Sequence, residues 1–360
     1  MIVLWIIYGL IVLSELILIL VFQFSFKEPL KITTATPHVS ILVAARNEEE
    51  HLGRCLNALT ASDYELDQVE ILVGNDHSTD KTEQIIQAFT QAFSFIKGVT
   101  IQDQKDGLIA KGNVLAQLVD QAKYDKILII DADMVVSKGW LSQMSVLLDQ
   151  YDLISGYTTV SATQKKGMVE YFDWAVVLHT MKAMADSFKP ISILGNNMGF
   201  RRMAYDQVGG FKGLGPTDVE DLGLLRRFQK AGKHTFQYVG KGGSAETLPQ
   251  VTFEQVLIQR CRWMNGLFKH NWLVSIPALF ARMWMSIGAI FTLIDLQTGL
   301  MILAYGIMIN CVKFFQISTR LGALKKFNGL SPFIISVLDT FALLRLIFVG
   351  KVSWKGRKFK

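Results

Sequence analysis

Hydrophobic residues follow different patterns in the middle of the chain and at its two ends. Both ends consist largely of long apolar runs, whereas the middle alternates short β-branched runs with segments of helical periodicity. Residues 2–22 are apolar over about the length that spans a bilayer. No basic segment precedes this run and no small-residue cleavage site follows it, so we expect no cleaved signal peptide. Glu15 within the run either pairs with another membrane helix or is tolerated near the centre of a single span.

The middle region carries the pattern of an α/β domain. The runs Val39–Ala45, Val69–Gly74 and Lys126–Ile130 are short and β-branched, which is typical of strands buried on both faces of a parallel sheet. A further strand is predicted at Val99–Gln102, and a long helix at Met168–Phe188. Because strand and helix patterns alternate, we expect an α/β fold with a mainly parallel, doubly wound sheet.

Two pairs of polar residues predict where later helices begin. Thr217 with Glu220, and Thr252 with Gln255, have the spacing of a capping box, in which each side chain bonds the backbone N–H of the other residue. The first pair precedes an apolar stripe that ends at Gly232, a residue type common just after a helix.

The last third of the chain reads as membrane-associated. Ile276–Ile294 and Leu300–Ile317 are candidate spans joined by a short non-basic connection, which predicts an in-out-in hairpin. Pro332–Val349 is a third apolar stretch, but Asp339 and Arg345 interrupt it and both of its flanks are basic. For this stretch we expect a re-entrant or interface-lying helix.

These patterns divide the chain into four predicted parts. They are an N-terminal transmembrane helix at residues 1–25, a main domain at 32–266, interfacial and transmembrane helices at 267–350, and a basic cytoplasmic tail at 351–360. Basic residues after the first apolar run place the main domain on the cytoplasmic face of the cell (inner) membrane.

Charge and cysteine content agree with a cytoplasmic membrane surface. The net charge is +6 and the mean hydropathy +0.29, and the Lys and Arg residues of the last third flank apolar segments. That distribution favours anionic lipid over nucleic acid, and no basic run interleaved with aromatics suggests a nucleic-acid groove. The three cysteines are far apart and form no C-x-x-C, which fits a reducing compartment.

Two acids follow directly after the predicted strand at 126–130. Asp131 and Asp133 would lie just past its carboxyl end, where open α/β sheets bind ligands. Two carboxylates separated by one residue can hold a hard divalent cation, which usually also takes phosphate oxygens. A strand-to-loop turn with solvated aspartates explains the same pattern, so the two acids alone leave both interpretations open.

Five motifs together resemble those of family 2 glycosyltransferases, in the family's order and approximate spacing. They are VSILVAARNEE, NDHSTD, DADMV, VED and QRCRW, and they cover about residues 39–266. That family has the GT-A (Rossmann-like) fold and includes cellulose, chitin and hyaluronan synthases and ceramide glucosyltransferases. The resemblance implies a nucleotide-sugar-dependent hexosyltransferase that inverts the anomeric carbon.

On the donor side, the resemblance implies a role for four residues. Asp76 would accept a hydrogen bond from the uracil of a UDP-sugar, although a helix-capping role also fits it. Asp133 would coordinate Mg²⁺ or Mn²⁺, and Asp131 would contact the metal and the ribose or sugar. Lys111 would contact the diphosphate or the donor sugar, with a solvated side chain as the alternative.

On the acceptor side, the resemblance points to the acidic pair. Asp221 would be the general base that deprotonates the acceptor hydroxyl. Glu220 would lie beside the acceptor, with the capping box as its alternative. Asn197, in a segment that resembles the family's acceptor-side loop, is a weaker candidate for acceptor binding.

The QRCRW motif places three candidate residues on one helix face. Gln259, Arg262 and Trp263 are spaced i, i+3 and i+4. Arg262 could pair with the diphosphate through its bidentate fork, Gln259 would assist donor binding, and Trp263 could offer its ring to the acceptor. An amphipathic helix lying on the membrane, with Trp at the interface, explains the same spacing.

The sequence alone does not identify the acceptor. Few predicted spans, no F-x-V-T-x-K gating pattern, and a W-K-G-R-K-F tail that resembles lipid-directed members favour a membrane lipid. A processive polysaccharide synthase acting on a glycan chain, as a homo-oligomer or with partner subunits, is the alternative. An inactive nucleotide-binding membrane scaffold is a third reading. The sugar is not identified, and a GDP donor is less expected than UDP.

Overall fold

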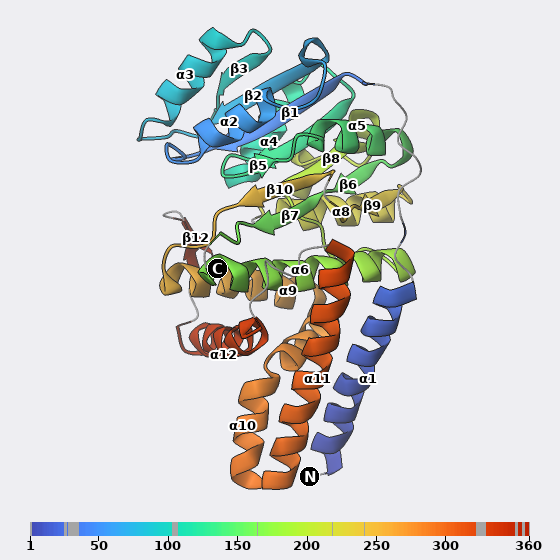
Figure 1. The fold of residues 1–360 in the computed structure, drawn as a ribbon. Helices are drawn as coiled ribbons and strands as arrows, with labels where there is room; N and C mark the ends of the chain where they lie inside the picture. Colours follow the sequence, from blue (N-terminus) through green and yellow to red (C-terminus); the bar gives the residue numbers. More distant parts are fainter. Residues whose placement is uncertain are drawn as a thin grey trace. The chain divides into compact units, whose positions relative to one another are not determined.

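The chain forms two compact units in the computed structural model (Figure 1). The structure describes residues 2–24, 27, 36–102, 107–163, 165–217, 219–240, 242–321, 329–349, 352–354 and 357–359. The helical unit comprises Met1–Phe26, Val160–Ala183 and Pro249–Lys360, and the sheet unit comprises Lys27–Thr159 and Met184–Leu248. The positions of the two units relative to one another are not determined. The four-part linear division therefore stays a prediction.

Two directions of helix make up the helical unit (Figure 1). Helices α1, α10 and α11 run alongside one another, whereas α6, α9 and α12 lie across them. The bounds are α1 Ile2–Phe24, α6 Lys165–Ser187, α9 Phe253–Arg282, α10 Trp284–Ile294, α11 Leu296–Leu321 and α12 Ser331–Val349, followed by the antiparallel pair β11 Val352–Trp354 and β12 Arg357–Phe359.

One predicted span was wrong. Residues 276–294 do not form one helix, because α9 ends at Arg282 and α10 begins at Trp284. At 11 residues, α10 extends only about 16 Å, roughly half of the hydrocarbon core. The other predicted span, Leu300–Ile317, lies within α11.

Two described helices, Leu296–Arg320 and Ser331–Val349, are long and apolar enough to cross a membrane by length and composition. Large apolar side chains of α1 and α11, including Leu10, Leu20, Ile307 and Phe315, are exposed. Exposed apolar faces of this extent mark contact with another apolar phase. These features support membrane association of the helical unit.

The partner expected for Glu15 is confirmed. Its carboxylate is buried and forms an ion pair with Lys313 of α11. Tyr305 of α11 also donates a hydrogen bond to the carbonyl of Val12, at 3.1 Å. Because a charge in an apolar phase is costly unless paired, the ion pair fixes α1 against α11.

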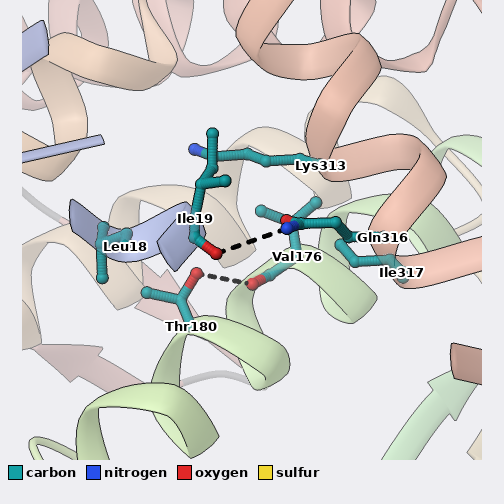
Figure 2. A pocket seen from close by; sticks show the side chains of 7 residues that line it. All are labelled: Leu18, Ile19, Val176, Thr180, Lys313, Gln316 and Ile317. Carbon is teal, nitrogen blue, oxygen red and sulfur yellow. Dashed lines mark hydrogen bonds between the residues drawn. The ribbon is translucent and has the colours of Figure 1, made fainter. Parts of the chain in front are cut away.

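A small cavity lies between α1, α6 and α11 in this unit (Figure 2). Its polar side chains already bond within the protein: Gln316 donates to the carbonyl of Ile19 at 3.3 Å, and Thr180 donates to the carbonyl of Val176 at 2.8 Å. We assign no ligand to it.

The sheet unit is built on a seven-stranded sheet of order β3-β2-β1-β4-β8-β6-β9. The first four strands are parallel, β8 is antiparallel to both of its neighbours, and β9 is parallel to β6. The bounds are β1 Val39–Ala45, β2 Val69–Asn75, β3 Ile96–Thr100, β4 Lys126–Asp131, β6 Leu153–Ser155, β8 Asn197–Arg201 and β9 Thr235–Gln237. The mainly parallel, doubly wound sheet is thereby confirmed, although β3 starts three residues before the expected Val99.

A second sheet, of order β5-β10-β7, was not predicted from the sequence. Its strands are β5 Val135–Val136, β7 Tyr157–Val160 and β10 Ser244–Thr247. The first has two residues and the last is mainly polar, so neither presents an apolar run. The apolar stretch at 153–160 is divided between the two sheets at Gly156.

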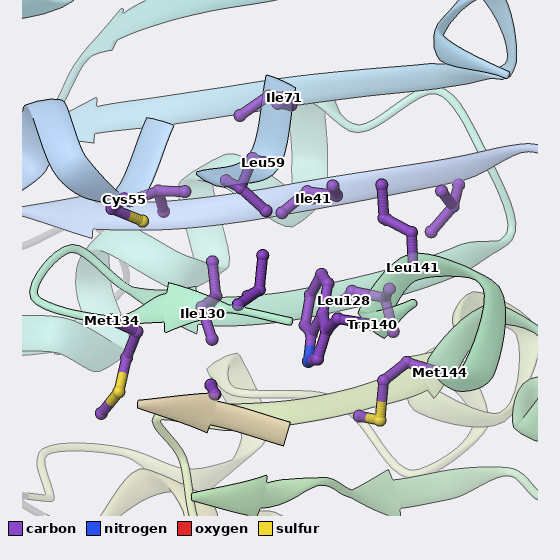
Figure 3. Packing of buried hydrophobic residues seen from close by; sticks show 14 of the residues in the cluster. Ile41, Cys55, Leu59, Ile71, Leu128, Ile130, Met134, Trp140, Leu141 and Met144 are labelled. Carbon is purple, nitrogen blue, oxygen red and sulfur yellow. The ribbon is translucent and has the colours of Figure 1, made fainter. Parts of the chain in front are cut away.

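Helices cover both faces of the large sheet, and alternate strand residues point to opposite faces. Ile41, Leu128 and Ile130 pack toward α2 and α5, with Trp140 and Met144 (Figure 3). The intervening strand residues pack toward α4 and α8. The helix bounds are α2 Leu52–Thr60, α3 Thr82–Ala92, α4 Ala110–Gln121, α5 Trp140–Gln150, α7 Arg202–Gln207 and α8 Glu220–Lys230, with short 3-10 turns at Leu66–Gln68 and Lys212–Leu214.

Of the two predicted capping boxes, one is confirmed. Thr252 and Gln255 bond reciprocally at the start of α9. The box at Thr217 and Glu220 was wrong, because the Thr217 hydroxyl accepts the N–H of Val219 instead, at 3.2 Å, and α8 begins without a side-chain cap. The capping explanation of Glu220 is therefore removed.

Candidate active site

Three parallel strands end at the edge of the sheet where the motif acids lie. In the strand register, Ala44 of β1 is opposite Asp131 of β4, and Ala45 is opposite Asn75 of β2. Asp76 follows β2 directly, and its N–H donates to the carbonyl of Ala45 at 2.9 Å. Asp76 and Asp131 thus lie two strand spacings apart, about 10 Å between backbones, with β1 between them.

Strand alternation decides the face toward which Asp131 points. Since Leu128 and Ile130 belong to the α2 and α5 face, Asp131 points with Ile129 toward α4 and α8. There it forms an ion pair with Lys111, from the first turn of α4. The Lys111 ammonium also donates to the carbonyl of Gly195 at 3.0 Å. The predicted lysine and the first motif acid therefore meet.

Asp221 is held on the other side of Gly195. The N–H of Gly195 donates to Asp221 Oδ2 at 2.9 Å, and the N–H of Leu222 donates to Oδ1 at 2.7 Å. A Cβ on residue 195 would lie 3.0 Å from the Asp221 side chain, so that side chain would have to move by a few tenths of an ångström to admit any residue other than glycine. Gly195 thus links the two side chains: the Gly195 carbonyl accepts from Lys111, and the Gly195 N–H donates to Asp221.

Glu220 completes the cluster from the buried side of α8. Burial raises its pKa to about 7; the charge of Lys111 opposes this rise, whereas Asp221 and Asp131 add to it. Burial would lower the pKa of Lys111, but Asp131, Glu220 and Asp221 together raise it above its ordinary value. The first turn of a helix also favours negative charge, because unpaired N–H groups point there.

Replacing Glu220 with glutamine is expected to stabilise the protein at alkaline pH only. The folded state raises the pKa of Glu220 from 4.5 to about 7, so it binds more protons than the unfolded chain between these values, and stability falls as pH rises through this range. Removing the ionisable group should raise unfolding free energy at pH 8 by at most about 3 kcal/mol, and have little effect at pH 4. Thermal unfolding at both pH values measures this.

Glu65→Gln is the control for that measurement, because Glu65 is exposed and lies outside the cluster. This substitution should change the free energy of unfolding only slightly, and by the same amount at pH 4 and pH 8. A Glu220→Gln variant that gains no stability at pH 8 over pH 4 would contradict the buried, proton-binding state of Glu220.

Asp133 lies beyond the ion pair, on the loop between β4 and β5. The Thr247 hydroxyl of β10 donates to Asp133 Oδ2 at 3.5 Å. Within the part of the chain that the structure describes, no three or more His, Cys, Asp or Glu side chains form a group that could hold a metal ion by themselves. Mg²⁺ commonly uses one or two carboxylates and completes its shell with substrate phosphates and water. Asp131 and Asp133 fit that donor set.

Asp76 is buried and accompanied by Arg46 from the end of β1. The Arg46 guanidinium donates to the Asp76 carbonyl at 3.3 Å and approaches its carboxylate at 3.5 Å. Arg46 is half-exposed, and it was not among the predicted site residues. The sequence signal for it was its position one residue past a buried strand.

Left-handed backbone gathers at this edge and at the start of α4. Asn47, His77 and Ala110 have φ angles of 52°, 54° and 51°. Such angles are strained for residues other than glycine and concentrate at functional sites. Ala110 precedes Lys111, so the strained residue sets the direction in which the lysine enters the cluster.

Asn197 is placed differently from the expectation. Its side chain is completely buried: Trp140 Nε1 donates to its Oδ1 at 2.9 Å, and its amide donates to the carbonyls of Tyr157 and Gly243 at 3.3 and 3.2 Å. These bonds join the two sheets. We therefore do not propose Asn197 as an acceptor contact.

The QRCRW residues lie in the helical unit, on α9. Trp263 packs edge-on against Trp174 of α6, with ring centroids 5.2 Å apart. Gln259 and Arg262 are partly exposed. Because the two units are described separately, the roles of Gln259, Arg262 and Trp263 stay predictions.

The comparisons with known proteins identify the family of this chain and agree with its fold. The family model for glycosyl transferase family 21 matches residues 1–360. The chain therefore belongs to glycosyl transferase family 21, and the glycosyltransferase resemblance drawn from the motifs is confirmed.

Three curated relatives are similar over different lengths. The probable glycosyltransferase YdaM of Bacillus subtilis is 27% identical over 64% of this chain and 55% of its own. A beta-monoglucosyldiacylglycerol synthase of Nostoc is 27% identical over 53% and 42%. The 4,4'-diaponeurosporenoate glycosyltransferase of Staphylococcus aureus is 22% identical over 89% and 88%. The chain thus spans about half the length of the first two.

A solved structure shares the fold. A mannosyltransferase from Pyrobaculum calidifontis, solved in complex with GDP-Man and Mn²⁺, superposes with a TM-score of 0.63 over 95% of this chain and 97% of its own. Sequence identity is 14%, so this likeness shows the fold alone. It confirms the GT-A-like class of the expected fold.

Proposed function

We propose that this protein is a membrane-bound inverting glycosyltransferase that moves a sugar from a UDP-sugar to a hydroxyl of a membrane lipid at the cytoplasmic face of the inner membrane. The observation that carries the proposal is the cluster of Lys111, Asp131, Glu220 and Asp221 around Gly195, at the ligand-binding edge of an α/β sheet. Because the chain belongs to a glycosyltransferase family, we assign glycosyl transfer to this cluster.

The donor would lie along the strand edge. Asp76, about two strand spacings from Asp131, would accept the N–H of the uracil, with Arg46 beside it. Lys111 would bind a phosphate or sugar oxygen, and Arg262, assisted by Gln259, would pair with the diphosphate. A GDP-sugar is the alternative donor, because the related mannosyltransferase was solved with GDP-Man.

A divalent cation, Mg²⁺ or Mn²⁺, would be held by Asp133 and Asp131. When bound, it supplies positive charge that offsets the charge growing on the departing diphosphate. The ammonium of Lys111, already paired with Asp131, adds to the positive charge on the donor side. The excess of carboxylates over ammonium groups in this cluster favours a cation.

Asp221 would act as the general base. It would take the proton of the acceptor hydroxyl while the hydroxyl oxygen bonds the anomeric carbon and the bond to the leaving diphosphate oxygen breaks. Two backbone N–H groups donate to the Asp221 carboxylate and fix its orientation. A single displacement of this kind inverts the anomeric centre. Glu220 and Trp263 would lie on the acceptor side.

Two observations favour a lipid acceptor. The helical unit exposes apolar faces that suit a bilayer, so an acceptor headgroup can be presented at its surface. Two of the relatives carry names with monoglucosyldiacylglycerol and diaponeurosporenoate, the first a glycolipid. A processive polysaccharide synthase, as a homo-oligomer or with partner subunits, is the alternative, and an inactive nucleotide-binding scaffold is the third reading.

Release of UDP or GDP by the purified protein distinguishes the lipid enzyme, the polymer synthase and the inactive scaffold. The protein is incubated with a panel of UDP- and GDP-sugars and Mn²⁺ or Mg²⁺, with and without membrane lipid, and the products are analysed by mass spectrometry. A lipid enzyme gives a glycolipid of fixed mass that requires the lipid. A ladder of masses identifies a polymer synthase, and no release with any donor identifies the scaffold.

A further inference from the structure

Four charged side chains in the helical unit form a closed ring of ion pairs. Arg260 contacts Asp173 of α6 at 2.5 Å and also pairs with Asp339 of α12. Arg282 contacts the other oxygen of Asp173 at 2.6 Å and the other oxygen of Asp339 at 2.7 Å. Each carboxylate bridges both guanidinium groups, so two positive and two negative charges are matched.

The ring requires α9 to bend back on itself. Arg260 and Arg282 both belong to α9 but are 22 residues apart, which corresponds to about 33 Å in a straight helix. They nevertheless reach the same two carboxylates. The core cluster of this unit likewise groups Cys261 and Met264 with Leu279 and Met283. The bend therefore falls between Met264 and Leu279, a stretch with a glycine and a proline, the usual causes of a kink.

Three of the four side chains in the ring are almost excluded from solvent, and the fourth is partly buried. Side-chain exposure is 4% for Arg260 and Asp173, 1% for Asp339 and 26% for Arg282. Burial would raise the pKa of Asp173, but Arg260 and Arg282 outweigh it and hold the pKa below its ordinary value. Buried charges bond well only in fixed geometry, because solvent cannot satisfy them in any other. Such a ring resists rotation of any helix that contributes to it.

One member of the ring, Arg260, belongs to the QRCRW motif. Arg260 follows Gln259 and precedes Arg262 by two residues, so its direction sets the rotation of the helix face that carries Gln259, Arg262 and Trp263. The neighbouring residue on α6, Trp174, packs against Trp263 at 5.2 Å between ring centroids. Adjacent residues of α6 thus hold two positions of α9 that are three residues apart.

We propose that the ring of Asp173, Arg260, Asp339 and Arg282 is a positioning device that fixes the orientation of the Gln259, Arg262 and Trp263 face of α9. The ring also explains why an aspartate occurs in the apolar helix α12. Asp339 lies on the buried side of α12 and anchors this helix to α9, while the opposite side of α12 stays apolar. This inference deepens the proposed function and rests on it for its catalytic consequence.

The test removes one charge of each sign, so that the remaining two charges of the ring still balance. Arg260→Met with Asp339→Leu replaces one buried ion pair by apolar groups, a change that proteins often tolerate without loss of stability. The double variant should keep its melting temperature to within about 5 °C. It should lose turnover by about 100-fold, mainly in kcat, because a small misplacement of binding groups has that effect. Hydrogen exchange of residues 255–266 should become faster.

A matched control joins the same two helices at the surface. Arg345 of α12 pairs with Glu254 of α9 at 2.7 Å, and both side chains are substantially exposed. Glu254→Gln should leave kcat and hydrogen exchange unchanged, since exposed pairs contribute little. Unchanged exchange and turnover in the double ring variant would overturn the proposal.

A second variant covers failure of the double variant to fold. Arg260→Lys keeps the charge but not the fork that reaches two carboxylates. A loss of kcat of about tenfold with an unchanged melting temperature supports the positioning role, and full activity with unchanged exchange overturns it. Hydrogen exchange needs no turnover. It therefore still tests whether the ring holds this face of α9 in place if the wild-type protein releases no UDP and the proposed function fails.

Discussion

Replacing Asp221 with asparagine is expected to lower kcat by about 10²–10⁴-fold, because the amide cannot accept the proton of the acceptor hydroxyl. Asparagine keeps the size of the side chain, so binding of the donor should change little. The amide cannot accept both the N–H of Gly195 and the N–H of Leu222, which adds a loss of orientation. Initial rates of UDP release over a range of donor concentrations separate kcat from KM.

Asp120→Asn is the control for this substitution. Asp120 lies on α4 of the same unit and pairs with Lys212 at the surface, at 2.9 Å. Its loss should leave the rate unchanged. If Asp221→Asn keeps activity to within a few-fold while Glu220→Gln loses it, the base is Glu220 and our assignment is wrong.

Replacing Asp133 with alanine is expected to lower kcat/KM by at least about 100-fold, since metal charge on a departing diphosphate supplies several kcal/mol of transition-state stabilisation. The wild-type rate should fall to the same level when EDTA is present and recover with Mn²⁺ or Mg²⁺. The variant should need a higher metal concentration for its remaining activity. Rates measured across a metal titration give both quantities.

Asp149→Ala provides the matched control. Asp149 pairs at the surface with Lys126, the first residue of β4, whereas Asp133 follows the other end of that strand. It should show the wild-type metal dependence. Full turnover by Asp133→Ala, or wild-type turnover in EDTA, would be incompatible with a metal held by this residue.

Local patterns were enough to predict the strands that support the site. Val39–Ala45 and Lys126–Asp131 are buried on both faces, and a strand of this kind has a continuous apolar run that sequence makes visible. The position of Asp76 and Asp131 follows from strand ends alone. By contrast, β5 and β10 have two and four residues and could not be recognised, because so short a strand has no measurable period.

Contacts between distant residues could not be predicted in the same way. The resemblance suggested Lys111 and Asp221 separately, but not that both bond Gly195. The bonds of Asn197 could not be predicted for a related reason: its side chain joins strands from two sheets, one of which the sequence did not reveal.

Neighbouring residues and their hydrophobic period are enough to predict the mainly parallel sheet, the acids at its carboxyl edge and the apolar ends of the chain. Which charges meet, by contrast, is visible only in the folded chain. Glu15 with Lys313, Lys111 with Asp131, and the ring through Asp173 and Asp339 all join residues at least 20 positions apart. Such pairs exist only after the chain has folded, because burial removes the water that would otherwise satisfy each charge separately.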